Sequence, residues 1–304
     1  MSARGAADAP TIITIDVEEW FHGHNYLAQV PPATWDRQAL RVETGTRRCL
    51  DLLDRHGARA TFFVLGWTAE RFPDLVREIA RRGHEVGCHS HGHPEIFHLT
   101  RDEFRRDGER ALAALARAGV DRPEGYRAPS FSLTPSVHHY LPVLQELGFR
   151  YDCSLFPVHH PRYGQPGSPR TPFRLGPGPE DLLLIPMPTW RCLGVNVPFS
   201  GGGYLRLLPW PAFRFLRDRA RAQGVPTIVY LHPWEMDDFR PAAKLSPLTR
   251  LRSQGKQDTM PVKLERILRE GPFLTLAEHA RRLRGDARVP VRALAARAEP
   301  VAAV

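Results

Sequence analysis

Short apolar runs alternate with longer amphipathic stretches along this chain, and that alternation restricts it to few folds. Strands are predicted at residues 11–16, 60–65, 85–89, 125–127, 150–152, 182–186, 227–231 and 273–276. Helices are predicted up to Gly57 and up to Gly83, and at residues 101–118, 136–147, 210–223, 262–269 and 277–282. Repeated β/α units build a parallel sheet covered by helices, so we expect an α/β fold.

The domain organisation follows from where this alternation holds. Residues 10–284 are predicted to form one domain with a C-terminal extension from about residue 150, and residues 1–9 a short N-terminal tail. Residues 157–179 are rich in Pro and Gly and are predicted to be a long irregular connection. The Ala, Arg, Val and Pro mixture of residues 285–304 predicts a disordered tail.

Composition narrows the class of protein. The hydrophobic share of 42% and the charged share of 25% over 304 residues are those of a globular protein. The net charge of +9 is compatible with nucleic acid, a membrane surface or an acidic polymer. Because the arginines are spread along predicted helices as solvated faces, we expect no nucleic-acid partner. We expect no transmembrane segment and a cytoplasmic protein, with peripheral association at the inner membrane face left open.

Candidate catalytic residues fall at the ends of predicted strands. They are Asp16 with Glu18, His89 with His93, Arg127, Asp152 and His232. In an α/β barrel the carboxyl ends of the strands face one shared mouth. Residues distant in sequence are therefore expected to converge on one site.

The first two motifs suit metal chemistry. Asp16 and Glu18 lie two positions apart and point to the same side of an extended chain, so one could hold a metal while the other takes a proton. His89 and His93 could bind the same metal if the backbone turns at Gly92. The alternatives are a polar strand end and a loop of solvated histidines.

Two later motifs offer a cation and an acid. Arg127, in YRAPS, could clamp a carboxylate and hold it ionised, although single arginines more often lie on the surface. His232, in YLHPWE, follows a strand and could donate a proton to a leaving group; its alternative is a structural role.

Together these motifs resemble those of the polysaccharide deacetylase family, the NodB-homology carbohydrate esterases. The segments TIDVEEWFH, HSHGH, YRAPSFS, YDCSLFP, GGGYLRLLPW and YLHPWE are most similar to the subgroup found with bacterial exopolysaccharide and exosortase loci. The resemblance runs from Thr11 to Glu235. It implies a distorted (β/α) barrel and the metal-dependent removal of acetyl groups from an N-acetylated polysaccharide or lipid-linked oligosaccharide.

The resemblance also implies roles for individual residues. Asp16 is expected to be the general base and His232 the general acid. Glu18, His89 and His93 are expected to bind a divalent metal, Zn²⁺, and Arg127 and Asp152 to be orienting partners. The first motif of the family commonly has adjacent aspartates, whereas here the second acid is Glu18, displaced by one position. An aromatic residue often follows the proline of the third motif, where this chain has Ser130, whose backbone N–H could still serve an oxyanion hole.

Aromatic residues beside these motifs are candidates for stacking on sugar rings. They are Trp20, Trp190, Tyr204 and Trp234, and together with Ser130 they form the predicted substrate-binding set. Core packing is the alternative for each aromatic residue.

The sequence leaves three alternatives to a deacetylase. An allantoinase-like amidohydrolase of the same fold could tolerate the altered first motif. A non-catalytic carbohydrate-binding relative would be expected to lose an acid or a histidine, and none is lost. Nucleic-acid binding is suggested only by the charge.

Overall fold

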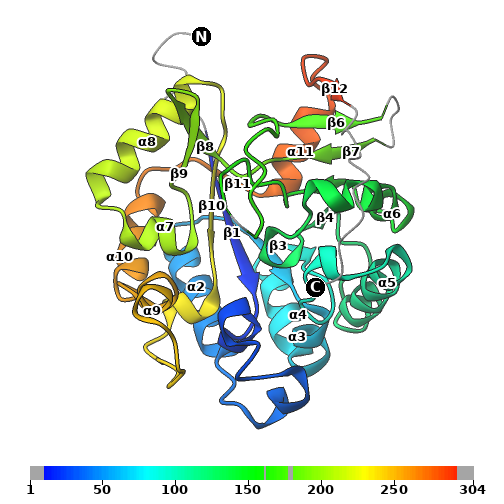
Figure 1. Ribbon diagram of the computed structural model, residues 1–304, viewed down its shortest axis with the longest axis vertical. Coiled ribbons are helices and arrows are strands. Elements are labelled where there is room, and N and C mark those ends of the chain that lie inside the picture. Colours follow the sequence, from blue (N-terminus) through cyan, green and yellow to red (C-terminus); the bar gives the residue numbers. More distant parts are fainter. Residues whose placement is uncertain (1–9, 161, 177–180, 293–304) are drawn as a thin grey trace.

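The protein has an α/β fold built on one mostly parallel sheet, shown by a computed structural model that describes residues 10–160, 162–176 and 181–292 (Figure 1). The strands of the sheet are β1 (Thr11–Val17), β2 (Thr61–Val64), β3 (Glu85–Cys88), β4 (Gly125–Tyr126), β5 (Tyr151–Asp152), β6 (Phe173–Leu175), β7 (Leu182–Leu184), β10 (Thr227–Leu231), β11 (Phe273–Leu274) and β12 (Val291–Arg292). Their order is β10-β1-β2-β3-β4-β5-β7-β6-β12, and β11 also pairs with β1. A separate antiparallel ribbon joins β8 (Thr189–Cys192) to β9 (Val195–Pro198).

Helices surround this sheet (Figure 1). They are α2 (Val42–Arg55), α3 (Gly66–Arg71), α4 (Pro73–Arg81), α5 (Arg101–Arg117), α6 (Leu141–Glu146), α7 (Gly202–Leu207), α8 (Trp210–Ala222), α9 (Pro247–Gln254), α10 (Thr259–Leu268) and α11 (Leu276–Arg284). Short 3-10 helices that matter for the site are η1 (Trp20–His22), η2 (His24–Tyr26), η5 (Pro129–Phe131) and η7 (Pro233–Met236). Within the described ranges, no helix is long and apolar enough to cross a membrane.

Both faces of the sheet are buried, as expected for parallel strands covered by helices. Successive side chains of a strand point to opposite faces. Ile13 of β1 accordingly packs in the large core that includes Leu50 of α2, while Ile12 packs in an inner core with Phe63 and Tyr151. A third, mainly aromatic cluster contains residues of η1 and lies next to the functional residues described below.

The predicted alternation of strands and helices is confirmed, and so is the α/β class with a mostly parallel sheet. No strand pairing closes the sheet into a complete ring within the residues that the structure describes. Beyond β10 a single parallel bridge joins Gly201 to Tyr230. The arrangement thus fits a distorted barrel with one open seam.

Several local predictions were wrong. The Pro- and Gly-rich stretch 157–179 is not wholly irregular, because it contains β6, and the helix expected over 136–147 begins as a 3-10 helix and becomes α-helical only at Leu141. Residues 285–292, assigned to the disordered tail, end in β12, which pairs with β6. The remaining tail residues, 1–9 and 293–304, lie outside the described residues.

Strand register brings the predicted site residues to one level. Val17 pairs with Val64, Val64 with Cys88, and Cys88 with Tyr126. The residue after each paired position is therefore held at the same edge of the sheet. Glu18, His89 and Arg127 each follow one of these paired residues and therefore lie at the same edge. Ile15 of β1 pairs with Leu231 of β10, so His232, which follows Leu231, lies at this edge as well.

The backbone of α2 packs closely against η7, which follows His232 at this edge of the sheet. A Cβ at Gly45 would lie 2.1 Å from the carbonyl oxygen of Pro233, next to His232. Gly45→Ala should therefore lower the free energy of unfolding by about 1–3 kcal/mol, the usual range for overpacking, as measured by denaturant titration.

Gly108→Ala in α5 is the matched control. Its Cβ would meet only the flexible end of Leu147, at 2.6 Å, and alanine is favoured over glycine in a helix. An equal loss of stability in both variants would contradict the proposed contact between α2 and η7.

Candidate active site

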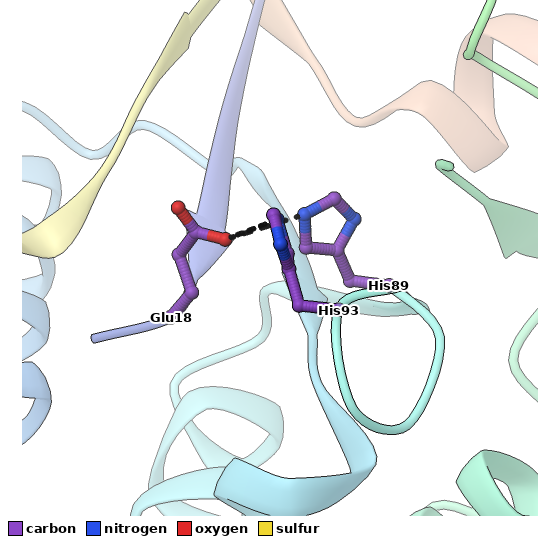
Figure 2. Close-up of side chains that lie close together, drawn as sticks. All are labelled: Glu18, His89 and His93. Carbon is purple, nitrogen blue, oxygen red and sulfur yellow. Dashed lines mark ion pairs between the residues drawn. The ribbon is translucent and has the colours of Figure 1, made fainter. Parts of the chain in front are cut away.

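Three side chains at this edge of the sheet form a candidate metal site (Figure 2). Glu18 follows β1, His89 follows β3, and His93 lies in the loop beyond it; one ligand atom from each lies within 4.8 Å of the others. The Oε2 atom of Glu18 is 2.8 Å from Nε2 of His93 and 3.7 Å from Nε2 of His89. Two imidazoles and one carboxylate are a common ligand set of catalytic zinc sites, which keep a further position open.

The surroundings of these three residues fit a cation. Oε2 of Glu18 is buried and, apart from the rings of His93 and His89, has no hydrogen-bond partner within the described residues. Burial alone would raise the pKa of Glu18, but His93, His89 and His232 hold it well below its ordinary value, so the group is a carboxylate. His89 Nδ1 lies 2.8 Å from the carbonyl oxygen of Arg127, an arrangement in which Nδ1 donates and the lone pair of Nε2 is free for a ligand bond.

Backbone conformation explains how one short loop supplies two ligands. Ser90 and His93 have positive φ angles of 69° and 58°, which turn the chain back toward Glu18. Asp107 of α5 fixes the turn by accepting hydrogen bonds from the backbone N–H groups of His91 and Gly92. The side chain of His91 points elsewhere, with Nε2 3.2 Å from Glu70 of α3.

Asp16 and Arg127 form a buried ion pair beside the candidate metal site. Arg127 Nη1 donates to Asp16 Oδ1 at 2.7 Å and to the hydroxyl of Thr14 at 2.8 Å. Both charged residues are almost fully buried, and Asp16 lines the same cavity as Glu18. Arg127 therefore holds a carboxylate through one of its oxygens, not through the two that a bidentate clamp would contact.

Asp152 lies farther from the cavity than its motif suggests. Its carboxylate accepts hydrogen bonds from the backbone N–H and hydroxyl of Ser154, and burial raises its pKa to about 7. The Ser154 hydroxyl in turn accepts from the backbone N–H of Ala128 at 2.8 Å. Asp152 thus supports the loop after Arg127, and any orienting role acts through Ser154.

His232 faces the candidate metal ligands from β10. Its Nε2 is 3.7 Å from Oε1 of Glu18, and its Nδ1 lies 2.9 Å from Oε2 of Glu235. Burial would lower the pKa of His232, but Glu235, Glu18 and Asp16 raise it to about 9. An imidazolium at this position can donate a proton into the cavity.

Sequence reasoning missed the support behind His232. Glu235 is fully buried, and Nη1 of Arg206 in α7 lies 3.1 Å from its Oε1 atom. Arg206 is also buried. An acid three residues after His232 could have been noticed in YLHPWE. Arg206 lies within the segment GGGYLRLLPW, but its contact with Glu235 depends on how α7 packs against η7, which a sequence motif does not give.

The cavity itself is small, with a volume of about 150 Å³. It is lined by Asp16, Glu18, Gly23, His89, His93, Ala128, Ser130, Phe131, His232 and Trp234. Of the predicted substrate-binding residues, Ser130 and Trp234 line it; Ser130 has a φ of 51°, and Trp234 stacks on His232.

The other predicted substrate-binding residues are elsewhere. Trp20 is buried in the aromatic cluster, with its Nε1 donating to the carbonyl of Ala39. Trp190 on β8 packs against Phe215 of α8. Tyr204 on α7 is partly buried against the inner core. None of these three residues lines the cavity, and their contacts agree with the core-packing alternative.

Comparisons with known proteins support the class that the fold and site indicate. Residues 31–151 match the family described as polysaccharide deacetylase, and residues 153–281 match a domain of unknown function. The polysaccharide deacetylase family is therefore supported, whereas the exopolysaccharide subgroup stays a prediction. The matched deacetylase region contains His89, His93 and Arg127; Asp16 and Glu18 precede it.

Individual relatives agree with this class. A peptidoglycan-N-acetylglucosamine deacetylase of Bacillus cereus is 38% identical over 84 residues, which are 28% of this chain and only 30% of that protein. A solved structure of a Mycobacterium smegmatis protein described as a polysaccharide deacetylase is 25% identical, with a TM-score of 0.63 and 94% of both chains covered. An allantoinase structure shares the fold at 17% identity, with a TM-score of 0.56 over 91% of this chain and 90% of its own.

Removing either histidine ligand should abolish metal binding. His89→Ala and His93→Ala each leave two protein ligands, so purified protein is expected to lose its metal, as measured by elemental analysis. His91→Ala is the matched control from the same loop and should keep its metal, because His91 faces Glu70. Full metal occupancy in both the His89 and His93 variants would disprove the assignment.

The contact between Glu235 and His232 should matter for proton donation. Glu235→Gln keeps the shape but removes the charge, so turnover on an acetamide is expected to fall on the order of ten- to a hundred-fold. An acetate ester with a good leaving group needs less acid assistance and should show a smaller loss. Glu70→Gln, which alters the carboxylate beside His91, is the control, and equal losses on amide and ester would argue for a merely structural role.

Proposed function

We propose that this protein removes N-acetyl groups from a polysaccharide or a lipid-linked oligosaccharide and releases acetate. The observation that carries the proposal is the convergence of three kinds of group on one cavity. A candidate metal triad, a carboxylate held by Arg127 and a histidine held by Glu235 all face it. This is the set that hydrolysis of an amide needs: activation of water, a base and an acid.

A divalent metal, which we propose to be Zn²⁺, would be held by Glu18, His89 and His93 and would polarise the acetamide carbonyl and lower the pKa of water. Asp16 accepts the proton that water loses as its oxygen attacks the carbonyl carbon. The hydrogen bond that Arg127 donates to Oδ1 of Asp16 holds this carboxylate beside the cavity.

His232, which follows the strand paired with β1, completes the reaction. As the C–N bond breaks, the imidazolium gives its proton to the departing nitrogen, so that a free amino sugar and acetate result. Glu235 holds the Nδ1 side of the ring and therefore directs Nε2 toward Glu18 and the cavity. The backbone N–H of Ser130 is proposed to stabilise the oxyanion.

Cavity size favours an acyl group over a whole sugar ring. Pockets that enclose drug-sized ligands usually have volumes of about 300–1,000 Å³, twice or more the volume found here. We therefore propose that the acetamido group alone enters, while the rest of the substrate lies along the mouth beside Trp234. Cytoplasmic action and a place among exopolysaccharide enzymes remain predictions from the sequence.

Two rival functions make different demands on the site. An allantoinase-like reaction places a whole small molecule in the cavity, and the shared fold alone does not distinguish it from deacetylation. A non-catalytic relative has no need of a paired base and acid, and here both Asp16 and His232 line the cavity.

Acetate release from a panel of N-acetylated oligosaccharides, with allantoin included, tests the proposal. The protein should release acetate, lose this activity to a chelator and regain it with added metal. Asp16→Asn should keep the metal but lower turnover by about 10² or more, as expected for the loss of a general base.

Two results would count against this assignment. Turnover of allantoin without acetate release would replace the proposed reaction. Loss of metal from Asp16→Asn would mean that Asp16 and Glu18 have exchanged roles.

A further inference from the structure

Residues 239–257, here called the basic segment, have a charge pattern that the proposed reaction does not explain. The segment contains Arg240, Lys244, Arg250, Arg252 and Lys256 and no acidic residue. It includes α9 and connects β10 with α10. Five positive charges in one segment are more than half of the net charge of +9 of the whole chain.

Contacts place the basic segment against elements that carry the active site. Asn25 of η2 donates to the hydroxyl of Ser253 at 2.7 Å, and Gln257 donates to the carbonyl of Trp234, which lines the cavity. Arg206, which supports Glu235, donates to the carbonyls of Arg252 and Ser253. The segment therefore flanks the mouth of the cavity.

The outer side of α9 is apolar as well as basic. Leu248 and Leu251, three residues apart on one helix face, are 56% and 49% exposed. Leu251 also lines a surface hollow together with Leu245, Pro247 and Arg250. The basic segment therefore presents exposed aliphatic side chains beside its positive charges.

The cations of the segment lack internal partners. Lys244, Arg250, Arg252 and Lys256 form no ion pair within the described residues, whereas nearby Arg48 pairs with Asp238. Arg240 differs from these four, because it donates to the backbone carbonyls of Asp237 and Phe239. Four cations are thus available to an anionic partner beside two exposed leucines.

We propose that Leu248, Leu251 and these four cations form a surface that docks on an anionic lipid bilayer, with the cavity mouth next to the membrane. Leucines at the acyl boundary and Lys or Arg at the headgroups are how interfacial helices bind membranes. A sugar polymer would be expected to meet aromatic side chains instead. The inference stands on the composition of this surface and does not depend on the reaction.

Co-sedimentation with vesicles tests the proposal on the full chain. The protein should bind vesicles of phosphatidylcholine mixed with phosphatidylglycerol and not vesicles of phosphatidylcholine alone. The double variants Leu248→Ser/Leu251→Ser and Arg250→Glu/Arg252→Glu should each weaken binding on the order of tenfold or more. Their denaturation midpoints and their acetate release from soluble substrate should match those of the unaltered chain.

The ribbon of β8 and β9 supplies a matched control. Leu193 at its tip is 99% exposed and Val195 is 55% exposed. Leu193→Ser/Val195→Ser should leave vesicle binding intact. The proposal is overturned if this variant abolishes binding while the α9 variants do not.

Failure of the unaltered chain to bind anionic vesicles would also overturn the proposal. If the protein is instead retained on an acidic polysaccharide, the cations of the basic segment bind a polymer and not a membrane. Because vesicle binding and acetate release are measured separately, failure of one does not imply failure of the other.

Discussion

The buried side chain of Arg127 is the interaction on which the site depends. It lies inside the sheet, donates to Thr14 and Asp16 of β1, and contacts the carbonyl of Cys153 after β5. Its own carbonyl faces His89 Nδ1, so one residue orients both the proposed base and a proposed metal ligand. A buried cation is tolerated only when it is paired and hydrogen-bonded, and leaving its partner unpaired is costly.

The two matched regions of the chain meet in one sheet and share one site. The boundary between them falls at β5, which pairs with β4 on one side and β7 on the other. The region of unknown function supplies β10, His232, Glu235 and Arg206. Its contribution to the site is therefore the proposed acid and its support, while the deacetylase region provides two of the proposed metal ligands.

The sequence predicted the fold class and the convergence of site residues because both depend on local pattern. Apolar runs followed by a polar residue locate strand ends, and parallel pairing then brings Glu18, His89 and His232 to one edge. Long-range side-chain contacts leave no such pattern. The support of Glu235 by Arg206 was missed for that reason, because it depends on which face of α7 meets a distant part of the chain.

A small cavity at the end of a sheet has a consequence for the pattern of modification. An enclosed tunnel would require a chain end, whereas a recess for one acyl group accepts any unit that presents its substituent from the side. If the substrate is a polymer, internal units are as accessible as terminal ones. The spacing of modified units along the product would then be set by the surface around the mouth, including Trp234, and by how long the polymer stays on it.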